Sequence, residues 1–272
     1  MKTVVKIGLA LALWLGLAAV AQAGWVIEFK EAQGPVGPSA YYAQDNMIRQ
    51  EMGQLAVVMD LNKEWLYYLN LAKQVYWEGP AAQMESAVKS EVQGQIETML
   101  ENLPPEQREA VREAMNQSQA EQSSPEKEAK IEVKKGKGTA VIAGHKCVQY
   151  QVFSDGELAV ELWLAKSVNL ADEVDSEKSA KLSAQMAGKG RGGPMNSPEV
   201  QALYDQGFPL RQVIYSMGLP TTIEATKAEK ASLPASLFKV PEGFKKVEFM
   251  EVMGGVWAGG EEEAGQEGEE EE

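Results

Sequence analysis

The sequence predicts an α+β fold in which one antiparallel sheet carries helices on one face. Three observations lead to this expectation. Apolar alternation rich in aromatic residues occurs near both ends of the chain, helical periodicity interrupts it twice, and no internal repeat is present. The resulting order of sheet, helices, sheet, helices, sheet favours a single sheet with helical insertions over two separate domains.

The first strands are expected between residues 25 and 77. Apolar and polar residues alternate through 25–29, 55–61 and 65–69, and a short polar turn at Asn62 and Lys63 separates the last two runs. Alternation with a period of two, divided by such turns, is typical of an antiparallel meander.

A helical insertion is predicted over residues 80–117. Pro80 suits the first turn of a helix, and apolar residues then recur at spacings of three and four, at Met84, Val88, Val92, Ile96, Met99, Leu100 and Leu103. This stripe predicts a helix of roughly six turns, followed by a short helix over 106–117. Residues 118–138 are rich in Gln, Ser, Glu and Lys, so we expect a flexible loop there.

Strands are expected to resume near Thr139. Alternating apolar residues at 148–152 and 158–164 predict a hairpin around the turn at Asp155 and Gly156. A polar helix over 172–187 and a short helix over 198–204 follow. The remaining segments, 210–217, 221–230 and 245–250, again have strand-like patterns.

The two ends of the chain predict export and a solvated tail. Residues 1–23 combine two lysines, an apolar run and the small-residue cleavage pattern Ala21-Gln22-Ala23, which together are typical of a secretory signal peptide. We therefore expect cleavage after residue 23, a periplasmic location, one domain over 24–253 and no transmembrane span. Residues 254–272 hold eight glutamates among glycines, and this composition indicates a disordered acidic tail.

Charge and composition exclude several classes of protein. The formal net charge of −14 argues against a nucleic-acid partner. With one Cys and one His, the chain has no internal disulfide and no usual zinc ligand set. His145 and Cys147 share a strand face, but spacing identifies no third group to orient the histidine. We therefore expect no catalytic constellation, no metal and no cofactor.

The aromatic strands and the helical stripe have two interpretations. They pack against each other as an ordinary core, or the helix and the sheet enclose an apolar cleft that an acyl chain can enter. Methionine suits the lining of such a cleft because its side chain adapts its shape. The candidate ligand-binding residues are Trp65, Tyr67, Trp77, Met84, Val88, Val92, Ile96 and Leu100.

Six motifs in order carry a family resemblance over roughly residues 24–247. They lie at 41–49, 58–76, 142–150, 161–166, 207–211 and 236–246. In these motifs the chain resembles a bacterial family of domains of unknown function, DUF4412. The resemblance implies a fold related to the periplasmic lipoprotein carriers LolA and LolB, in which a strongly curved antiparallel sheet, a half-barrel, carries helices over its concave face.

The leading functional hypothesis is an exported, non-catalytic periplasmic protein that binds or chaperones an apolar ligand, either a lipid or the acyl chain of an acylated protein. The alternative is an envelope protein–protein interaction module whose core is filled by its own side chains and which takes no ligand. An exported hydrolase is a third hypothesis. The carrier hypothesis requires an open apolar cleft, and the interaction hypothesis requires a filled one.

Overall fold

The computed structural model describes residues 23–30, 39–101, 103–104, 107–109, 111–112, 129–187, 193–216 and 219–254. The predicted signal peptide except Ala23, most of the predicted helix 106–117, residues 118–128 and the residues of the predicted acidic tail after Gly254 lie outside the described residues.

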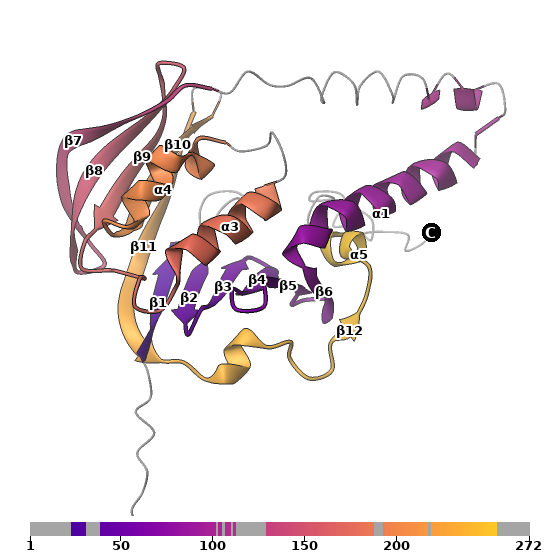
Figure 1. The fold of residues 1–272 in the computed structure, drawn as a ribbon, viewed down its shortest axis with the longest axis horizontal. Helices are drawn as coiled ribbons and strands as arrows, with labels where there is room; N and C mark the ends of the chain where they lie inside the picture. Colours follow the sequence, from indigo (N-terminus) through magenta and orange to yellow (C-terminus); the bar gives the residue numbers. More distant parts are fainter. Residues whose placement is uncertain are drawn as a thin grey trace, which may run out of the picture.

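One sheet of twelve strands organises the described part of the chain (Figure 1). Its order is β12-β6-β5-β4-β3-β2-β1-β11-β10-β9-β8-β7, and every pair is antiparallel except β12 with β6, so the sheet is mixed. The strands are β1 (Ala23–Phe29), β2 (Ala40–Gln44), β3 (Met47–Met52), β4 (Leu55–Asp60), β5 (Trp65–Asn70), β6 (Val75–Pro80), β7 (Ile131–Ile142), β8 (His145–Ser154), β9 (Glu157–Ala165), β10 (Phe208–Ser216), β11 (Leu219–Ser232) and β12 (Lys245–Lys246).

The helices follow the predicted insertions closely. They are α1 (Ala81–Glu101), α3 (Ser176–Ala187), α4 (Pro198–Tyr204) and α5 (Phe249–Met253), with 3-10 turns η1 (Pro194–Asn196) and η2 (Ala235–Phe238). The predicted meander, the long helix after Pro80 and the short helix at 198–204 are confirmed. In the described ranges no helix combines the length and the apolar character that a membrane span needs.

The sheet is open and is neither closed nor strongly curled, which differs from the expected half-barrel. Strands β12 and β7 stand at opposite ends of the strand order and do not pair with each other. The two halves, β1–β6 and β7–β10, are joined through the long strand β11, which pairs with β1 along one part of its length and with β10 along another. This junction joins the two halves into one continuous open sheet.

Two local predictions are wrong. The loop expected over 118–138 ends earlier, because β7 begins at Ile131 and pairs with β8, with Val133 opposite Val152. The strand expected over 245–250 is only the two residues of β12, after which α5 begins at Phe249. Pairing with the neighbouring strand β8 in the first case, and packing of α5 on the distant strands β5 and β6 in the second, outweigh the local pattern.

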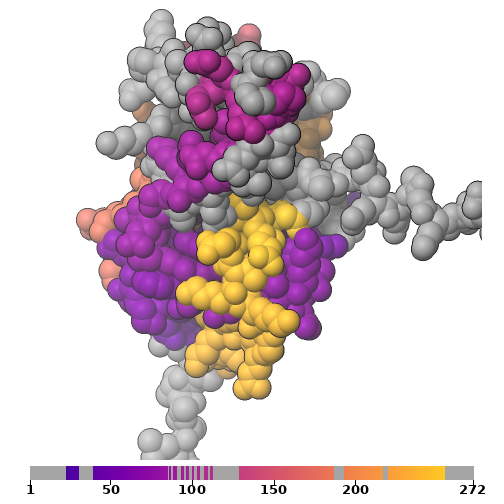
Figure 2. All heavy atoms as spheres, turned by 90° about the vertical axis from the view of Figure 1, so that its right-hand side faces the viewer, coloured from indigo at the N-terminus to yellow at the C-terminus, as the bar shows by residue number. Residues whose placement is uncertain are grey.

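Helices cover one face of the β1–β6 half, and residues of the segment 233–244, which includes η2, pack on the other. Side chains of α1, α3 and α5 join the largest buried cluster with one face of the strands. On the opposite face, Phe238 of η2 packs with Ala56, Val58 and Leu69. Figure 1 shows α1 and α3 above these strands and η2 below them, and Figure 2 shows the yellow C-terminal segment lying against the purple strands.

A separate small cluster fills the space under α4. Val200 and Leu203 of α4 pack on Tyr150, Val152 and Leu162 of the β8–β9 hairpin. The predicted turn of this hairpin is confirmed: Asp155 and Gly156 have φ values of 50° and 88°, which suit a two-residue hairpin turn.

Candidate functional site

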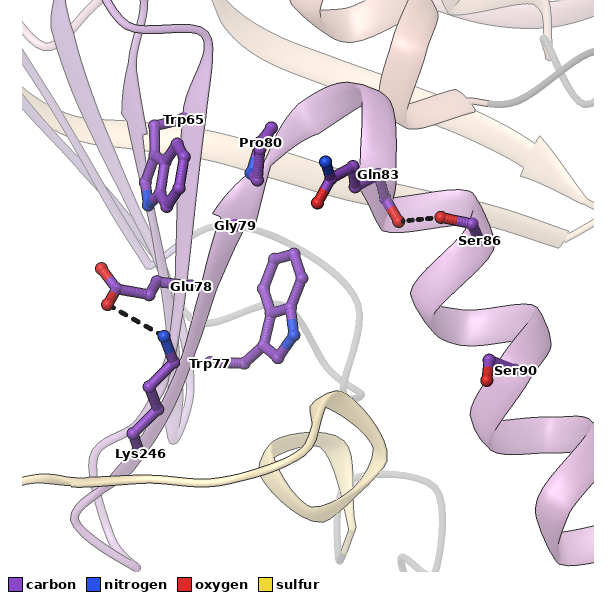
Figure 3. Close-up of a pocket in the computed structure, with 9 residues that line it drawn as sticks. All are labelled: Trp65, Trp77, Glu78, Gly79, Pro80, Gln83, Ser86, Ser90 and Lys246. Carbon is purple, nitrogen blue, oxygen red and sulfur yellow. Dashed lines mark hydrogen bonds and ion pairs between the residues drawn. The ribbon is translucent and has the colours of Figure 1, made fainter.

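The candidate site is a pocket where β5 and β6 end and α1 begins. Its volume is about 540 Å³ and it is open to solvent. The residues that line it are Trp65, Trp77, Glu78, Gly79, Pro80, Gln83, Ser86, Ser90 and Lys246 (Figure 3). The lining thus combines two tryptophans and a proline with polar side chains from β6 and α1 and one lysine.

Strand register places the two tryptophans on different faces of the sheet. Trp65 pairs with Pro80, and Tyr68 pairs with Trp77, so alternation puts Trp65 and Trp77 on opposite faces. The pocket therefore wraps around the end of the strand pair, and in Figure 3 the two indoles flank the strand that leads into α1.

Gly79 determines how the Trp77 indole lies. A Cβ atom at position 79 would lie 2.8 Å from two carbon atoms of that ring, closer than real Cβ contacts come. The absence of a side chain at Gly79 allows the indole to lie along the strand, where it is 8% exposed. Trp77 therefore contributes to both the pocket and the core.

The rim of the pocket is polar. The Lys246 Nζ lies 3.1 Å from Glu78 Oε1, and the lysine side chain is 56% exposed. On α1, the Ser86 hydroxyl donates to the Gln83 carbonyl oxygen at 2.8 Å. The Trp65 Nε1 is buried and has no hydrogen-bond partner among the described residues.

Beneath the pocket, α5 fills the space between the sheet and α1. The Phe249 ring packs edge-on against Tyr68 and Trp77, with centroid distances of 5.0 and 5.5 Å. Asn70, which is 1% exposed, donates from Nδ2 to the Val252 carbonyl oxygen at 3.0 Å and anchors the helix. The apolar cleft considered from the sequence is therefore occupied by the chain's own side chains at this point.

The predicted ligand-binding residues are divided among different parts of the structure. Trp65 and Trp77 line the pocket, whereas Met84 and Val88 pack on the largest buried cluster. Tyr67 lies on the opposite face, in the cluster with Phe238.

The last three predicted residues lie further along α1. Ile96 is half-buried, Leu100 is buried, and the side chain of Val92 is outside the described residues. Neither Ile96 nor Leu100 lines the pocket. The sequence missed the polar rim because Lys246 reaches Glu78 only through the pairing of β12 with β6, and the α1 serines lie on the polar side of a helix that is predicted from its apolar stripe.

The His145–Cys147 pair does not form. The Cys147 thiol, 1% exposed, donates to the His145 backbone oxygen at 3.5 Å, and burial raises the pKa of this thiol. The imidazole instead contacts the Ser167 hydroxyl and the Ala228 carbonyl. Cys147 is therefore a protected thiol rather than a nucleophile.

A second pocket, of about 480 Å³, is acidic. Asp45, Asp172, Glu173 and Asp175 line it with Asn46. The Lys230 Nζ lies 3.5 Å from Asp172 and 3.4 Å from Glu173 and offsets part of this charge. Across the described ranges, no group of three or more His, Cys, Asp or Glu side chains has an arrangement that could hold a metal ion.

Comparisons with known proteins identify a family but no activity. Residues 103–244, more than half of the chain, match the family model described as "Domain of unknown function (DUF4412)". A search of curated proteins finds no match.

Two solved structures of PNGF-II, in the C2 and P21 space groups, are similar to this chain at 11% identity with TM-scores of 0.36 and 0.37. The matches cover 86% and 87% of this chain, which spans only 33% of the PNGF-II chain. This likeness concerns the path of the chain and carries no information about activity.

Proposed function

Because the chain belongs to the DUF4412 family of domains of unknown function, we propose a function from the geometry of its own pocket. The protein binds an anionic amphiphile, such as a fatty acid or the acyl chain of a lipid or acylated protein, at the Trp65–Trp77 pocket. The signal-peptide pattern of residues 1–23 supports action after export, in the periplasm.

The observation that carries the proposal is an indole on the same face of the sheet as a lysine: alternation puts Trp65 and Pro80 on the face of Glu78, which pairs with Lys246, while Trp77 lines the pocket from the other face. Ligand sites combine mostly apolar surface with a few placed polar groups, and here Trp65, Trp77 and Pro80 supply the surface. Lys246 supplies a cation at the rim, where an anionic head group can pair with it while the acyl chain contacts the Trp65 indole.

The filled core limits how deep a ligand goes. Phe249 and Val252 occupy the space between the sheet and α1. An acyl chain therefore binds along the surface pocket rather than inside a concave sheet. The expected relation to the LolA and LolB carriers lends this proposal no support, because the open sheet differs from the half-barrel on which that analogy rests.

The direct test is titration of detergent-free protein with a fluorescent fatty acid. We expect saturable binding to wild type and a Kd raised about tenfold in Trp65→Ala, which corresponds to about 1.4 kcal/mol. Trp163→Phe is the matched control, because Trp163 lies on β9, away from the pocket residues. Absence of saturable binding in wild type, or equal affinity in Trp65→Ala, contradicts the proposal.

The second candidate is an envelope interaction module, and the filled core favours it. A protein whose interior is occupied by Phe249 needs no ligand to complete its packing. Wild type that binds no fatty acid but recovers a stable envelope partner during purification would support this alternative over the amphiphile-binding function.

A further inference from the structure

The single histidine of the chain lies between two polar partners at the junction of the two halves of the sheet. His145 opens β8, and its Nδ1 is 2.8 Å from the Ser167 Oγ in the turn after β9. On the other side of the ring, Nε2 is 2.9 Å from the backbone oxygen of Ala228 in β11. The serine and the carbonyl lie 22 and 83 positions away in the sequence.

The carbonyl determines the tautomer of the neutral ring. A backbone carbonyl oxygen only accepts hydrogen bonds, so Nε2 carries the proton and donates to Ala228. Nδ1 is then the unprotonated nitrogen, and the Ser167 hydroxyl donates to it. A hydroxyl that donates to an imidazole whose other nitrogen is held by an acceptor is the arrangement of a nucleophile with its general base.

The surrounding side chains hold the imidazole in place. The Trp25 indole meets it edge-on with ring centroids 6.4 Å apart, and Trp25 is itself fixed because its Nε1 donates to the Asn169 carbonyl oxygen at 2.8 Å. Trp25 of β1 and Ala228 of β11 thus hold the His145 ring in position, while the Ser167 side chain is exposed to solvent.

We propose that Ser167 is a nucleophile activated by His145 and that it reacts with activated carboxylic esters. This activity goes beyond the proposed binding function and does not depend on the Trp65–Trp77 pocket. Neither of the two pockets described above includes Ser167. Which ester reacts therefore depends on the reactivity of the ester rather than on a binding pocket. The substrate class that we expect is esters with a good leaving group, such as aryl esters.

The reaction proceeds in two balanced steps. The Ser167 Oγ attacks the carbonyl carbon and passes its proton to His145 Nδ1, and the bond to the leaving oxygen breaks as that oxygen takes the proton. This leaves an acyl-serine and a free alcohol. Water then attacks the acyl-serine through the same base, which restores Ser167 and releases the carboxylic acid, so one ester and one water give one acid and one alcohol.

The test uses a fluorophosphonate probe, which phosphonylates activated serine hydroxyls with loss of fluoride, followed by peptide mass mapping. We expect modification at Ser167 in wild type, none at that position in Ser167→Ala, and a rate at least about 100-fold lower in His145→Gln. The same variants are assayed for 4-nitrophenyl acetate hydrolysis. Ser236→Ala removes an exposed serine of η2 and is expected to react like wild type.

Thermal melting of each variant separates lost reactivity from lost folding. If His145→Gln does not fold, the comparison becomes native wild type against urea-unfolded wild type, and only the native form is expected to react at Ser167. Modification spread over several serines, or an unchanged rate in a folded His145→Gln, overturns the proposal. Either result leaves fatty-acid binding unaffected, so the two proposals fail independently.

Discussion

The Phe249 ring meets the Trp77 indole edge-on, with ring centroids 5.5 Å apart and an angle of 86° between the ring planes. One residue belongs to β6 and the other to α5, 172 positions later. Aromatic pairs in this orientation stabilise a core beyond the effect of the area that they bury. The contact joins the C-terminal helix to the strand that forms the pocket.

Phe249→Ala is therefore expected to lower the free energy of unfolding by about 3–5 kcal/mol, because a buried aromatic ring is replaced by a space that the neighbouring rings fill only in part. Urea denaturation followed by circular dichroism measures the change. Val141→Ala, at a side chain that is 69% exposed, is the control, with an expected change within about 0.5 kcal/mol. Equal small losses in both variants would mean that α5 contributes little to the core.

Gly79→Ala tests whether the Trp77 indole must lie along the strand. The added Cβ lies 2.8 Å from the ring, so the indole is displaced, and we expect a loss of about 1–3 kcal/mol together with a shift in tryptophan emission. Gly94→Ala in α1 is the matched control, since no heavy atom lies within 4 Å of its added Cβ. Because alanine favours a helix over glycine, Gly94→Ala should instead gain up to about 1 kcal/mol. The same sign in both variants would contradict this interpretation.

Alkaline pH is expected to destabilise the fold through Tyr68. Burial raises the pKa of its phenol from 10.0 to about 12. Between these values the unfolded chain ionises first and binds fewer protons than the folded chain. The free energy of unfolding therefore falls by about 1.4 kcal/mol per pH unit for this group, and the stability present below pH 10 is progressively lost.

Urea midpoints measured between pH 9 and pH 12 test this dependence. Tyr68→Phe, which removes the phenol that donates to Met84 Sδ at 3.5 Å, should show a shallower alkaline decline than wild type. Tyr67→Phe, at a side chain that is only half-buried, is the control and should retain most of the wild-type slope. Identical slopes for wild type and Tyr68→Phe would exclude this tyrosine as a cause.

Local patterns were sufficient to predict the elements that depend on local interactions. The stripe beginning at Met84 predicted a six-turn helix, and α1 spans Ala81–Glu101. Asp155 and Gly156 predicted a hairpin turn that is present. The helix depends on the spacing of nearby apolar residues, and the turn depends on positive φ values that few residues adopt. Both can therefore be predicted from a single segment.

The contacts that form the candidate sites join distant segments and have no local signature. Lys246 reaches Glu78 only because β12 pairs with β6. His145 gains its orienting partner from Ala228, in a strand that is not its neighbour in the sheet order. The alternation over residues 245–250 predicts a strand at Phe249, but the ring is buried against Tyr68 from a helix instead. Tertiary packing therefore determines the Lys246–Glu78 pair, the His145–Ala228 contact and the helix at Phe249.

The Glu78–Lys246 pair provides the last prediction, which concerns the charge of the ligand. Glu78 Oε1 lies 3.1 Å from Lys246 Nζ and competes with any anionic head group for that cation. Glu78→Gln removes the competing charge and should lower the Kd for a fatty acid about threefold to tenfold, whereas Lys246→Gln should raise it by a similar factor, because each change alters an exposed charge pair by about 1 kcal/mol.

The matched fatty alcohol, which has the same chain and no carboxylate, separates charge from apolar contact. Its affinity should be unchanged in both variants, since neither change alters the apolar surface of Trp65 and Pro80. Salt should weaken the binding of the acid and leave the alcohol unaffected, because the Debye length falls to about 3 Å at 1 M salt. If Glu78→Gln and Lys246→Gln shift the acid in the same direction, the lysine does not bind the head group, and the ligand lies elsewhere in the pocket.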